Sequence, residues 1–292
     1  MDEVVYLNGK LVPAKEARVS IYDHGLLYGY GLFETMRAYN GKIFLLERHI
    51  NRLTVSAKYA GLSDALAGID LAKACTDTLK ANNLKEARIR LTVTGGEADT
   101  FPWAGTDSPA TVVITAKPFV SIPEDKYEQG FRVRIASVRH CRDSKLSGIK
   151  STSYLISVLA KKEATAQGLD EALLLNDDGY IAEGGSSNVF FVRSSRLITP
   201  SEGSGILPGI TRQVVIELAE ELDIAVTEGT VGMAIIRQCE EAFLTNSTME
   251  IMPMVMASDE TGWTVKIGTG RPGPITLKLM AAYRERVTRE TS

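Results

Sequence analysis

The sequence is poor in the residues on which several classes of protein depend. It has three cysteines, Cys75, Cys141 and Cys239, which are widely spaced. They form no CxxC motif and have no pair of histidines nearby. A disulfide scaffold and a metal site such as zinc are therefore not expected. Reduced structural thiols are typical of a cytoplasmic protein, and this is the location that the sequence predicts.

A long apolar run and an excess of charge of one sign are also missing. No stretch of about 18 uninterrupted apolar residues occurs, so no membrane-spanning helix is expected. The first residues, MDEVVYLNGK, are acidic and strand-like, unlike the basic start of a signal peptide. The 33 lysines and arginines nearly balance the 36 aspartates and glutamates, for a formal net charge of -3. Nucleic acid is therefore not an expected partner.

What the chain does have is enough apolar sequence for a large core. Its 292 residues are 44% hydrophobic, which suits one large or two ordinary domains. The stretch KPFVSIPEDKYEQG combines two prolines, five charges and no periodicity. It predicts a linker at residues 119–126, between a small α+β domain at 1–118 and a larger, β-rich domain at 127–292.

The periodicity of the first domain predicts two hairpin strands around Asn8-Gly9 and helices at residues 46–59 and 71–81. Residues 32–39 alternate, with Phe33, Thr35 and Arg37 on one face and mostly apolar residues on the other. Residues 87–94 alternate as well, and Arg90 falls on their polar face. Residues 95–109 have the composition of a loop.

The second domain shows shorter strands between helices. Helices are predicted at residues 153–167, 211–222 and 275–287. Strands are predicted at residues 131–138, 172–175, 180–182, 188–192, 197–199, 224–227, 242–244 and 265–267.

Three features of the second domain suit the chemistry of an anionic cofactor with a pyridine ring. Gly209 opens a helix, whose first N–H groups and positive dipole favour a phosphate. Glu183 lies in the Gly/Ser-rich turn EGGSSN, where a carboxylate could keep a pyridine nitrogen protonated. Lys150 starts a helix and could form a Schiff base. Taken singly, each is also explained by helix punctuation, a solvated turn acid or a surface lysine.

Together these motifs resemble the class IV, or fold-type IV, pyridoxal-phosphate enzymes. The similarity rests on Glu183, Gly185, the run Asn188-Val189-Phe190, and Gly209-Ile210 followed by Arg212. It extends to YDHGLLYGYGLFETMRAYNG, FLLERHINRL, ARIRLTVT and LTNSTMEIMP, and so covers most of the chain. The family includes branched-chain aminotransferases, D-amino-acid aminotransferases and aminodeoxychorismate lyases.

The resemblance implies a role for each residue that matches the family pattern. Lys150 would form the Schiff base with pyridoxal 5'-phosphate and act as the base, and Glu183 would hold the pyridine nitrogen. Tyr154 would approach the phenolic oxygen, although it follows Lys150 at one residue less than in branched-chain enzymes. The phosphate would be bound by Arg52, Ile210, Thr211 and Ser247, where Ser247 replaces the threonine of many relatives.

The resemblance also implies substrate-binding residues, but it leaves the substrate open. Tyr28, Phe33 and Arg37 fit the branched-chain pattern YGxxxFExxR. Arg90 also matches those enzymes, and Thr248 would help to bind the α-carboxylate. Thr35 instead matches the threonine of the lyases. The Arg and His one residue apart that typical D-amino-acid enzymes carry after the strand at 87–94 are replaced here by Gly95-Gly96-Glu97.

The predicted function is ping-pong transfer of an amino group from a branched-chain L-amino acid to a 2-oxo acid such as 2-oxoglutarate, by a cytoplasmic homodimer. The alternatives are an aminodeoxychorismate lyase that releases pyruvate, and a D-amino-acid or (R)-amine transaminase. A non-enzymatic α+β protein that holds another phosphorylated ligand is a further alternative.

Overall fold

The computed structural model describes residues 2–98, 101–102, 109–142 and 146–292, and it shows two compact units. Unit 1 consists of Met1–Val120, Ile149–Ser153 and Val287–Ser292, and unit 2 of Ser121–Gly148 and Tyr154–Arg286. The division into 1–118, 119–126 and 127–292 stays a prediction, and it did not include the two short segments that return to unit 1.

Unit 1 is built on a six-stranded sheet in the order β2-β1-β6-β5-β3-β4, and each neighbouring pair is antiparallel. The predicted hairpin is confirmed, since Asn8 and Gly9 have φ angles of 46° and 93°, which a tight turn of this kind needs. The strands are β1 (Val4–Leu7), β2 (Lys10–Pro13), β3 (Gly31–Tyr39), β4 (Lys42–Ile43), β5 (Ala87–Thr94) and β6 (Thr111–Pro118).

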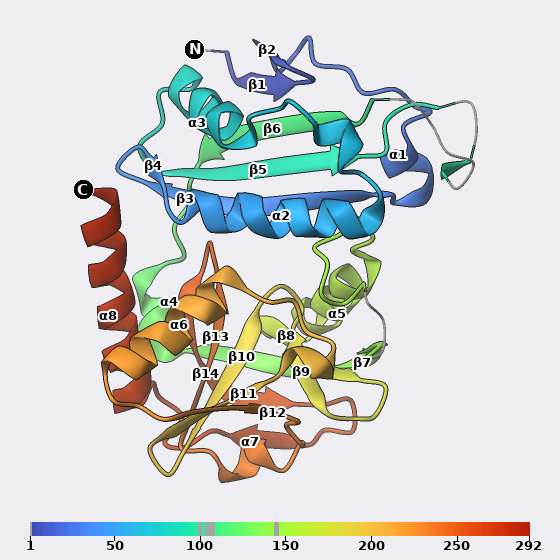
Figure 1. Ribbon diagram of the computed structural model, residues 1–292. Coiled ribbons are helices and arrows are strands. Elements are labelled where there is room, and N and C mark those ends of the chain that lie inside the picture. Colours follow the sequence, from blue (N-terminus) through green and yellow to red (C-terminus); the bar gives the residue numbers. More distant parts are fainter. Residues whose placement is uncertain (1, 99–100, 103–108, 143–145) are drawn as a thin grey trace. The chain divides into compact units, whose positions relative to one another are not determined.

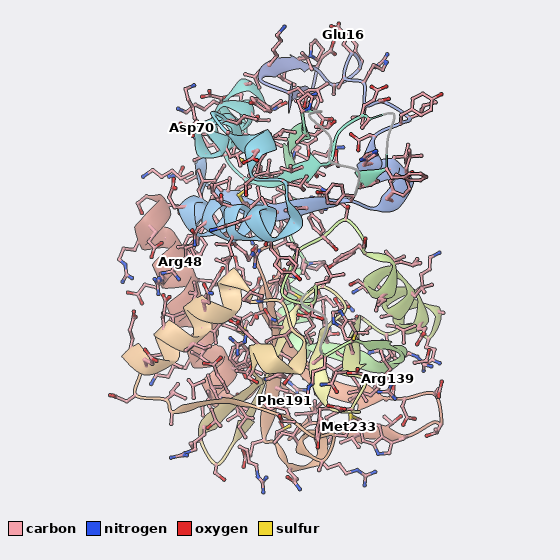
Figure 2. All side chains as sticks on the ribbon, turned by 45° about the vertical axis from the view of Figure 1, so that its right-hand side comes forward. Glu16, Arg48, Asp70, Arg139, Phe191 and Met233 are labelled. Carbon is pink, nitrogen blue, oxygen red and sulfur yellow. The ribbon has the colours of Figure 1, made fainter. Side chains whose placement is uncertain are left out.

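Helices cover one face of this sheet (Figure 1). Apolar residues of α2 (Leu46–Ala60) and α3 (Leu71–Ala81) pack with the inward residues of β3, β5 and β6 in one buried cluster. Both helices were predicted and are confirmed, with α3 capped by Asp70, whose side chain accepts a hydrogen bond from Lys73 at 2.8 Å (Figure 2). The described part of this unit also contains α1 (His24–Tyr28) and the short η1 (Asp64–Leu66).

Unit 2 contains a larger sheet in the order β12-β11-β10-β13-β14-β7-β8-β9, with β15 paired to β14. The backbone N–H of Ile181, in β9, donates to Val231, just after β12, so the sheet curls until its two ends meet. Phe191 lies on β10 and is fully buried (Figure 2). The strands are β7 (Phe131–His140), β8 (Glu171–Asn176), β9 (Ile181–Gly184), β10 (Asn188–Arg193), β11 (Arg196–Pro200), β12 (Val226–Gly229), β13 (Glu241–Asn246), β14 (Glu250–Ser258) and β15 (Thr264–Lys266).

The helices of unit 2 follow the predicted periodicity. Alanines of α5 (Leu155–Ala166) pack on β7 and β8, and α6 (Ile210–Glu221) buries Val214, Val215 and Leu218. The others are α4 (Glu124–Gln129), α7 (Ile235–Gln238), the short η3 (Glu202–Ser204) and α8 (Pro274–Thr291), whose last residues belong to unit 1. No helix in the described part of the chain is both long and apolar enough to cross a membrane.

Seven of the described elements were not predicted: the short α1, β4, η1, η3 and α7, and also α4 and β14. Half of helix α4 lies in the predicted linker, and β14 was missed because Pro253 interrupts its sequence and argues against a strand. The pairing of β14 with β7 shifts register directly after this proline, between Met254 and Met256. Residues 99–100 and 103–108 of the predicted loop at 95–109 lie outside the described residues.

Candidate active site

The main chain of Lys150 is fixed by β3. The carbonyl oxygen of Lys150 accepts from the N–H of Phe33 at 2.9 Å, and the carbonyl oxygen of Gly31 accepts from Thr152 at 2.9 Å. Gly31 permits this approach, because a Cβ atom there would lie 3.0 Å from Thr152 Oγ1 and 2.8 Å from the carbonyl oxygen of Val93. The segment Ile149–Ser153 therefore runs along β3 as part of unit 1.

Two cations meet the ring of Phe33 on the sheet face opposite the helices. Lys150 Nζ lies 4.7 Å from the ring centroid, and Arg90 Cζ lies 3.9 Å from it. The register places Arg90 directly opposite Thr35, so Phe33, Thr35 and Arg90 share one face, as the alternation predicted. Such contacts favour a fixed position for each cation.

The other face of β3 carries a buried carboxylate among apolar residues. Glu34 is 1% exposed and accepts from Arg52 Nε at 2.8 Å and from Arg52 Nη2 at 2.6 Å. It also pairs with His49 Nδ1 at 2.7 Å. Both partners come from α2, and the Arg52 side chain is 11% exposed. The predicted phosphate-binding arginine is thus held at one edge of its guanidinium.

The protonation of this cluster follows from its contacts. Burial alone would raise the pKa of Glu34, but the charge of Arg52 and hydrogen bonds from His49 and Arg52 outweigh it and lower the pKa to about 2. Burial lowers the pKa of His49, and the charges of Arg52 and Lys150 lower it further, against the effect of Glu34. His49 is therefore neutral near pH 7, and its Nδ1–H donates to Glu34.

Arg37 takes a different environment from Arg90. Its Cζ lies 3.9 Å from the centroid of the Phe119 ring and 4.2 Å from that of Tyr39, and Nη2 lies 3.9 Å from Glu86. These contacts explain its position on the sheet by packing. Its role in substrate binding stays a prediction.

Tyr28 belongs to the short helix α1, which is anchored by a buried aspartate. Asp23 is 1% exposed, caps α1 through the N–H of Gly25 at 2.7 Å, and accepts from the hydroxyls of Thr94 at 2.8 Å and Thr111 at 2.7 Å. Tyr28 itself is 46% exposed and ends α1. Its place on the surface of unit 1 suits a residue that contacts a ligand.

Within unit 2, Glu183 is oriented from three sides. Its Oε2 accepts from the N–H of Leu207 at 3.1 Å and from Asn188 Nδ2 at 3.2 Å. Its Oε1 lies 3.9 Å from His140 Nε2, while His140 Nδ1 donates to the carbonyl oxygen of Gly205 at 3.1 Å. Burial lowers the pKa of His140, although the hydrogen bond to Gly205 opposes this, so the imidazole is neutral. Glu183 is thus a partly buried, fixed acid rather than a solvated turn residue.

The start of α6 leaves its first backbone N–H groups without a side-chain cap among the described residues. Its N-cap is Gly209, where a Cβ atom would lie only 1.9 Å from Asn188 Oδ1. Ile210 and Thr211 form the first turn and are buried, with Thr211 3% exposed. Arg212 Nη2 ties the same turn to Pro200 at 2.9 Å and to Glu228 at 2.6 Å.

Two other predicted residues of unit 2 lie in turns. Ser247 belongs to the β13–β14 turn, where the Asn246 side chain accepts from the N–H and hydroxyl of Thr248, at 2.9 and 3.0 Å. To bind a carboxylate through its N–H and hydroxyl, Thr248 must give up these two hydrogen bonds to Asn246. The hydroxyl of Tyr154 donates to the carbonyl oxygen of Gly185 at 3.3 Å, close to Glu183 in sequence.

Comparison with known proteins settles the family. The model of the family "Amino-transferase class IV" matches residues 31–256. The chain belongs to the class IV aminotransferases. A Methanocaldococcus jannaschii protein named "Putative branched-chain-amino-acid aminotransferase" is 39% identical over 282 residues, which cover 96% of this chain and 95% of that protein. The aminodeoxychorismate lyase of Bacillus subtilis is 33% identical over 289 residues, covering 97% and 94%.

A solved structure of the same class confirms the predicted fold. The branched-chain amino acid aminotransferase of Escherichia coli matches this class IV aminotransferase with a TM-score of 0.90 and 30% identity, over 100% of this chain and 97% of that one. The prediction of a two-domain α+β fold of type IV is therefore correct. So are the predictions of an enzyme of the transaminase class and of pyridoxal phosphate as its cofactor, since another solved branched-chain enzyme, with a TM-score of 0.88, contains pyridoxamine 5'-phosphate.

The donor groups of this chain fit that cofactor. An amine fixed on a strand, a partly buried carboxylate and an uncapped helix start match its aldehyde, its ring nitrogen and its phosphate. Lys150, Glu183 and the first turn of α6 are the residues that would hold it. Sequence reasoning missed Glu34, His49, Asp23 and His140. The signal for Glu34 was present, since it is the one carboxylate on the apolar side of residues 32–39.

Proposed function

We propose that this class IV aminotransferase moves the amino group of a branched-chain L-amino acid to a 2-oxo acid such as 2-oxoglutarate. The observation that carries this proposal is the surroundings of the Phe33 ring. The amine of Lys150 and the guanidinium carbon of Arg90 both lie within 5 Å of the centre of this ring. An apolar side chain suits the ring, and a carboxylate suits Arg90.

The roles of the cofactor-binding residues belong to the same proposal. Lys150 would hold pyridoxal phosphate covalently, Glu183 would pair with its ring nitrogen, and Tyr154 would approach its phenolic oxygen. Arg52, Ile210, Thr211 and Ser247 bind the phosphate. The bound cofactor supplies an electron sink for the bond broken at the substrate Cα. The fixed geometry of Glu183 supports this assignment, because its hydrogen bonds from Leu207 and Asn188 favour the charged carboxylate.

The proton is moved by the chain itself. With the cofactor bound, the Lys150 amine would serve as the base that takes a proton from the substrate Cα and later gives it back. The main-chain hydrogen bonds of Lys150 and Thr152 to β3 keep the segment that carries the base in place during both half-reactions. Tyr28, Phe33, Thr35, Arg37, Arg90 and Thr248 are the residues proposed to bind the substrate.

The lyase is a second candidate, favoured by one specific observation. Thr35, which matches the lyases, lies directly opposite Arg90 in the register, so a hydroxyl and a guanidinium are neighbours on the predicted substrate face. Such a pair can bind a polar substrate with a ring carboxylate. The relative from Bacillus subtilis carries this name.

One experiment separates the candidates. The purified protein is assayed with a panel of L- and D-amino acids and amines, each with 2-oxoglutarate or pyruvate as acceptor, and in parallel for pyruvate release from aminodeoxychorismate. Fast turnover of leucine, isoleucine and valine with 2-oxoglutarate supports the proposal. Pyruvate release without transamination establishes the lyase. If the protein has its cofactor bound and catalyses neither reaction, both candidate functions are rejected.

We also propose that the protein is a cytoplasmic homodimer. Large apolar side chains at the start of α5 are exposed, including Leu155 at 67% and Leu159 at 42%, and a second copy would cover them. Burial raises the pKa of Cys75 and of Cys239 to about 12, which keeps these thiols protonated and suits a reducing compartment. Light scattering coupled to gel filtration tests the dimer, and a monomer at micromolar concentration rejects it.

A further inference from the structure

The cluster of Glu34, His49 and Arg52 is costly for its place in the protein. Glu34 and His49 are 1% and 2% exposed, on the side of the sheet that packs against α2. A buried ion pair returns little stability compared with apolar residues of the same size, because both charges lose their hydration. Stability alone is therefore a weak reason for this arrangement.

Geometry supplies a stronger reason. Arg52 meets Glu34 through Nε and Nη2, which lie on one edge of the guanidinium, at 2.8 and 2.6 Å. A bidentate pair fixes the plane of an arginine as well as its position. The opposite edge, which carries Nη1, is consequently turned away from Glu34 in a defined direction.

His49 fixes the carboxylate in turn. Its Nδ1–H donates to Glu34 Oε2 at 2.7 Å, and that same oxygen accepts from Arg52 Nη2. His49 and Arg52 both lie on α2, three residues apart, so one helix face carries the arginine and the group that orients its partner. The orientation of Arg52 is thus determined by two successive hydrogen-bonded contacts.

The cluster also lies near the proposed catalytic amine. The charge of Lys150 acts on His49, and both residues belong to unit 1. Lys150 is joined to Phe33, the residue beside Glu34 on β3, by a hydrogen bond of 2.9 Å. The strand to which the main chain of Lys150 is bonded therefore also carries the carboxylate that orients the arginine.

We propose that Glu34 is a positioning residue that sets the guanidinium of Arg52 to receive the cofactor phosphate, with His49 holding Glu34 in place. This inference rests on the proposed function, in which Arg52 binds that phosphate. Two effects of Glu34 oppose each other. Its charge repels the phosphate, while its two hydrogen bonds prearrange Arg52. The gain in phosphate binding from prearrangement is larger than the loss from repulsion.

The test compares two ligands of the apo-protein, pyridoxal 5'-phosphate and pyridoxal, which differ only in the phosphate. In Glu34→Gln the shape is kept, but the amide nitrogen faces the N–H groups of Arg52 and His49. We expect its Kd for pyridoxal phosphate to rise about 10- to 100-fold, the effect of losing a charged hydrogen bond, with the Kd for pyridoxal unchanged. Arg52→Lys should behave likewise, and the double variant should be no weaker than the weaker single variant.

Control variants exclude a general effect on the fold. Met36→Leu changes a fully buried residue on the same face of β3 and should alter neither Kd. His49→Leu removes the donor to Glu34 and should weaken pyridoxal phosphate alone, whereas His49→Asn keeps a donor and should restore binding. These histidine variants test the inference independently if Glu34→Gln does not fold.

Each result has one reading. Equal binding of pyridoxal phosphate by wild type and Glu34→Gln, or equal weakening of both ligands, overturns the positioning role and leaves the proposed function intact. If instead the wild type binds neither ligand, the proposed function fails, and the inference fails with it. Additive losses in the double variant also overturn it, because Glu34 and Arg52 would then act separately.

Discussion

Lys150 and Phe33 are joined twice, by a 2.9 Å hydrogen bond between their main chains and by the approach of Lys150 Nζ to 4.7 Å from the Phe33 ring. The first contact fixes where the lysine leaves the backbone, and the second limits where its amine can lie. A strand that packs against a helical core thus holds the group from which the proposed chemistry starts.

Replacement of Lys150 by alanine should abolish transamination while leaving the fold intact, since the side chain is not part of the buried core. We expect a fall in kcat of at least about 10²-fold, the usual value of a positioned base. Borohydride reduction followed by peptide mass spectrometry should show the cofactor attached to Lys150 in the wild type and to no lysine in the variant. The exposed Lys162→Ala is the matched control, and wild-type turnover in Lys150→Ala would assign the reaction to another amine.

Glu183→Gln keeps the size of the side chain and removes the charge that should hold a proton on the ring nitrogen. The loss of one prearranged electrostatic group typically costs about 10²- to 10³-fold in kcat. Exchange of the substrate Cα hydrogen with deuterated solvent measures the affected step directly and should slow by the same factor. Glu202→Gln, at an exposed turn position, should exchange at the wild-type rate. An unchanged rate in Glu183→Gln would contradict its assignment.

Elements that depend on residues close together in the sequence could be predicted, and those that depend on distant partners could not. Local periodicity sufficed for α2 and α3, and turn chemistry sufficed for the hairpin at Asn8-Gly9. It failed for β14, because Pro253 argues against a strand and one partner of β14 is β7, a strand more than 100 residues earlier. The return of Ile149–Ser153 to β3 was missed for the same reason, since no local pattern marks a partner so distant in sequence.

The candidate residues show the same limit. Lys150 and Glu183 were found through motifs that resemble a known family, and their surroundings were not. Nothing in the sequence near Glu183 points to His140 or to the N–H of Leu207, which come from other elements. Arg90 was placed on the correct face by alternation, but its contact with Phe33 required the register of β3 and β5.

Arg90→Leu should discriminate between acceptors. If Arg90 binds the side-chain carboxylate of 2-oxoglutarate, the variant should lose about 10- to 100-fold in kcat/KM for that acid. For an acceptor with a single carboxylate, such as pyruvate, kcat/KM should change little. Arg88→Leu removes an exposed arginine from the same face of the same strand and is the matched control. Equal losses for both acceptors would instead assign Arg90 to the α-carboxylate.

Acid should destabilise unit 1 through the cluster around Glu34. The pKa of Glu34 is about 2 in the folded protein, below its ordinary value of 4.5, so the folded state binds this proton more weakly than the unfolded state. The resulting stabilisation is complete above about pH 4.5 and is lost as the pH falls toward 2. By linkage it amounts to on the order of 3 kcal/mol. His49 acts in the same direction from pH 6.5 downward, because burial lowers its pKa as well.

Hydrogen exchange of peptides from α2 and β3 measures this loss locally, after correction for the intrinsic effect of pH on exchange. We expect the opening free energy of both elements to fall between pH 7 and pH 3.5 in the wild type. In Glu34→Gln the fall below pH 4.5 should largely disappear, because no proton is taken up at that position on unfolding. Glu47→Gln, an exposed acid on the same helix, should retain the wild-type pH dependence. A pH dependence that survives in Glu34→Gln would place the acid sensitivity of unit 1 in other carboxylates.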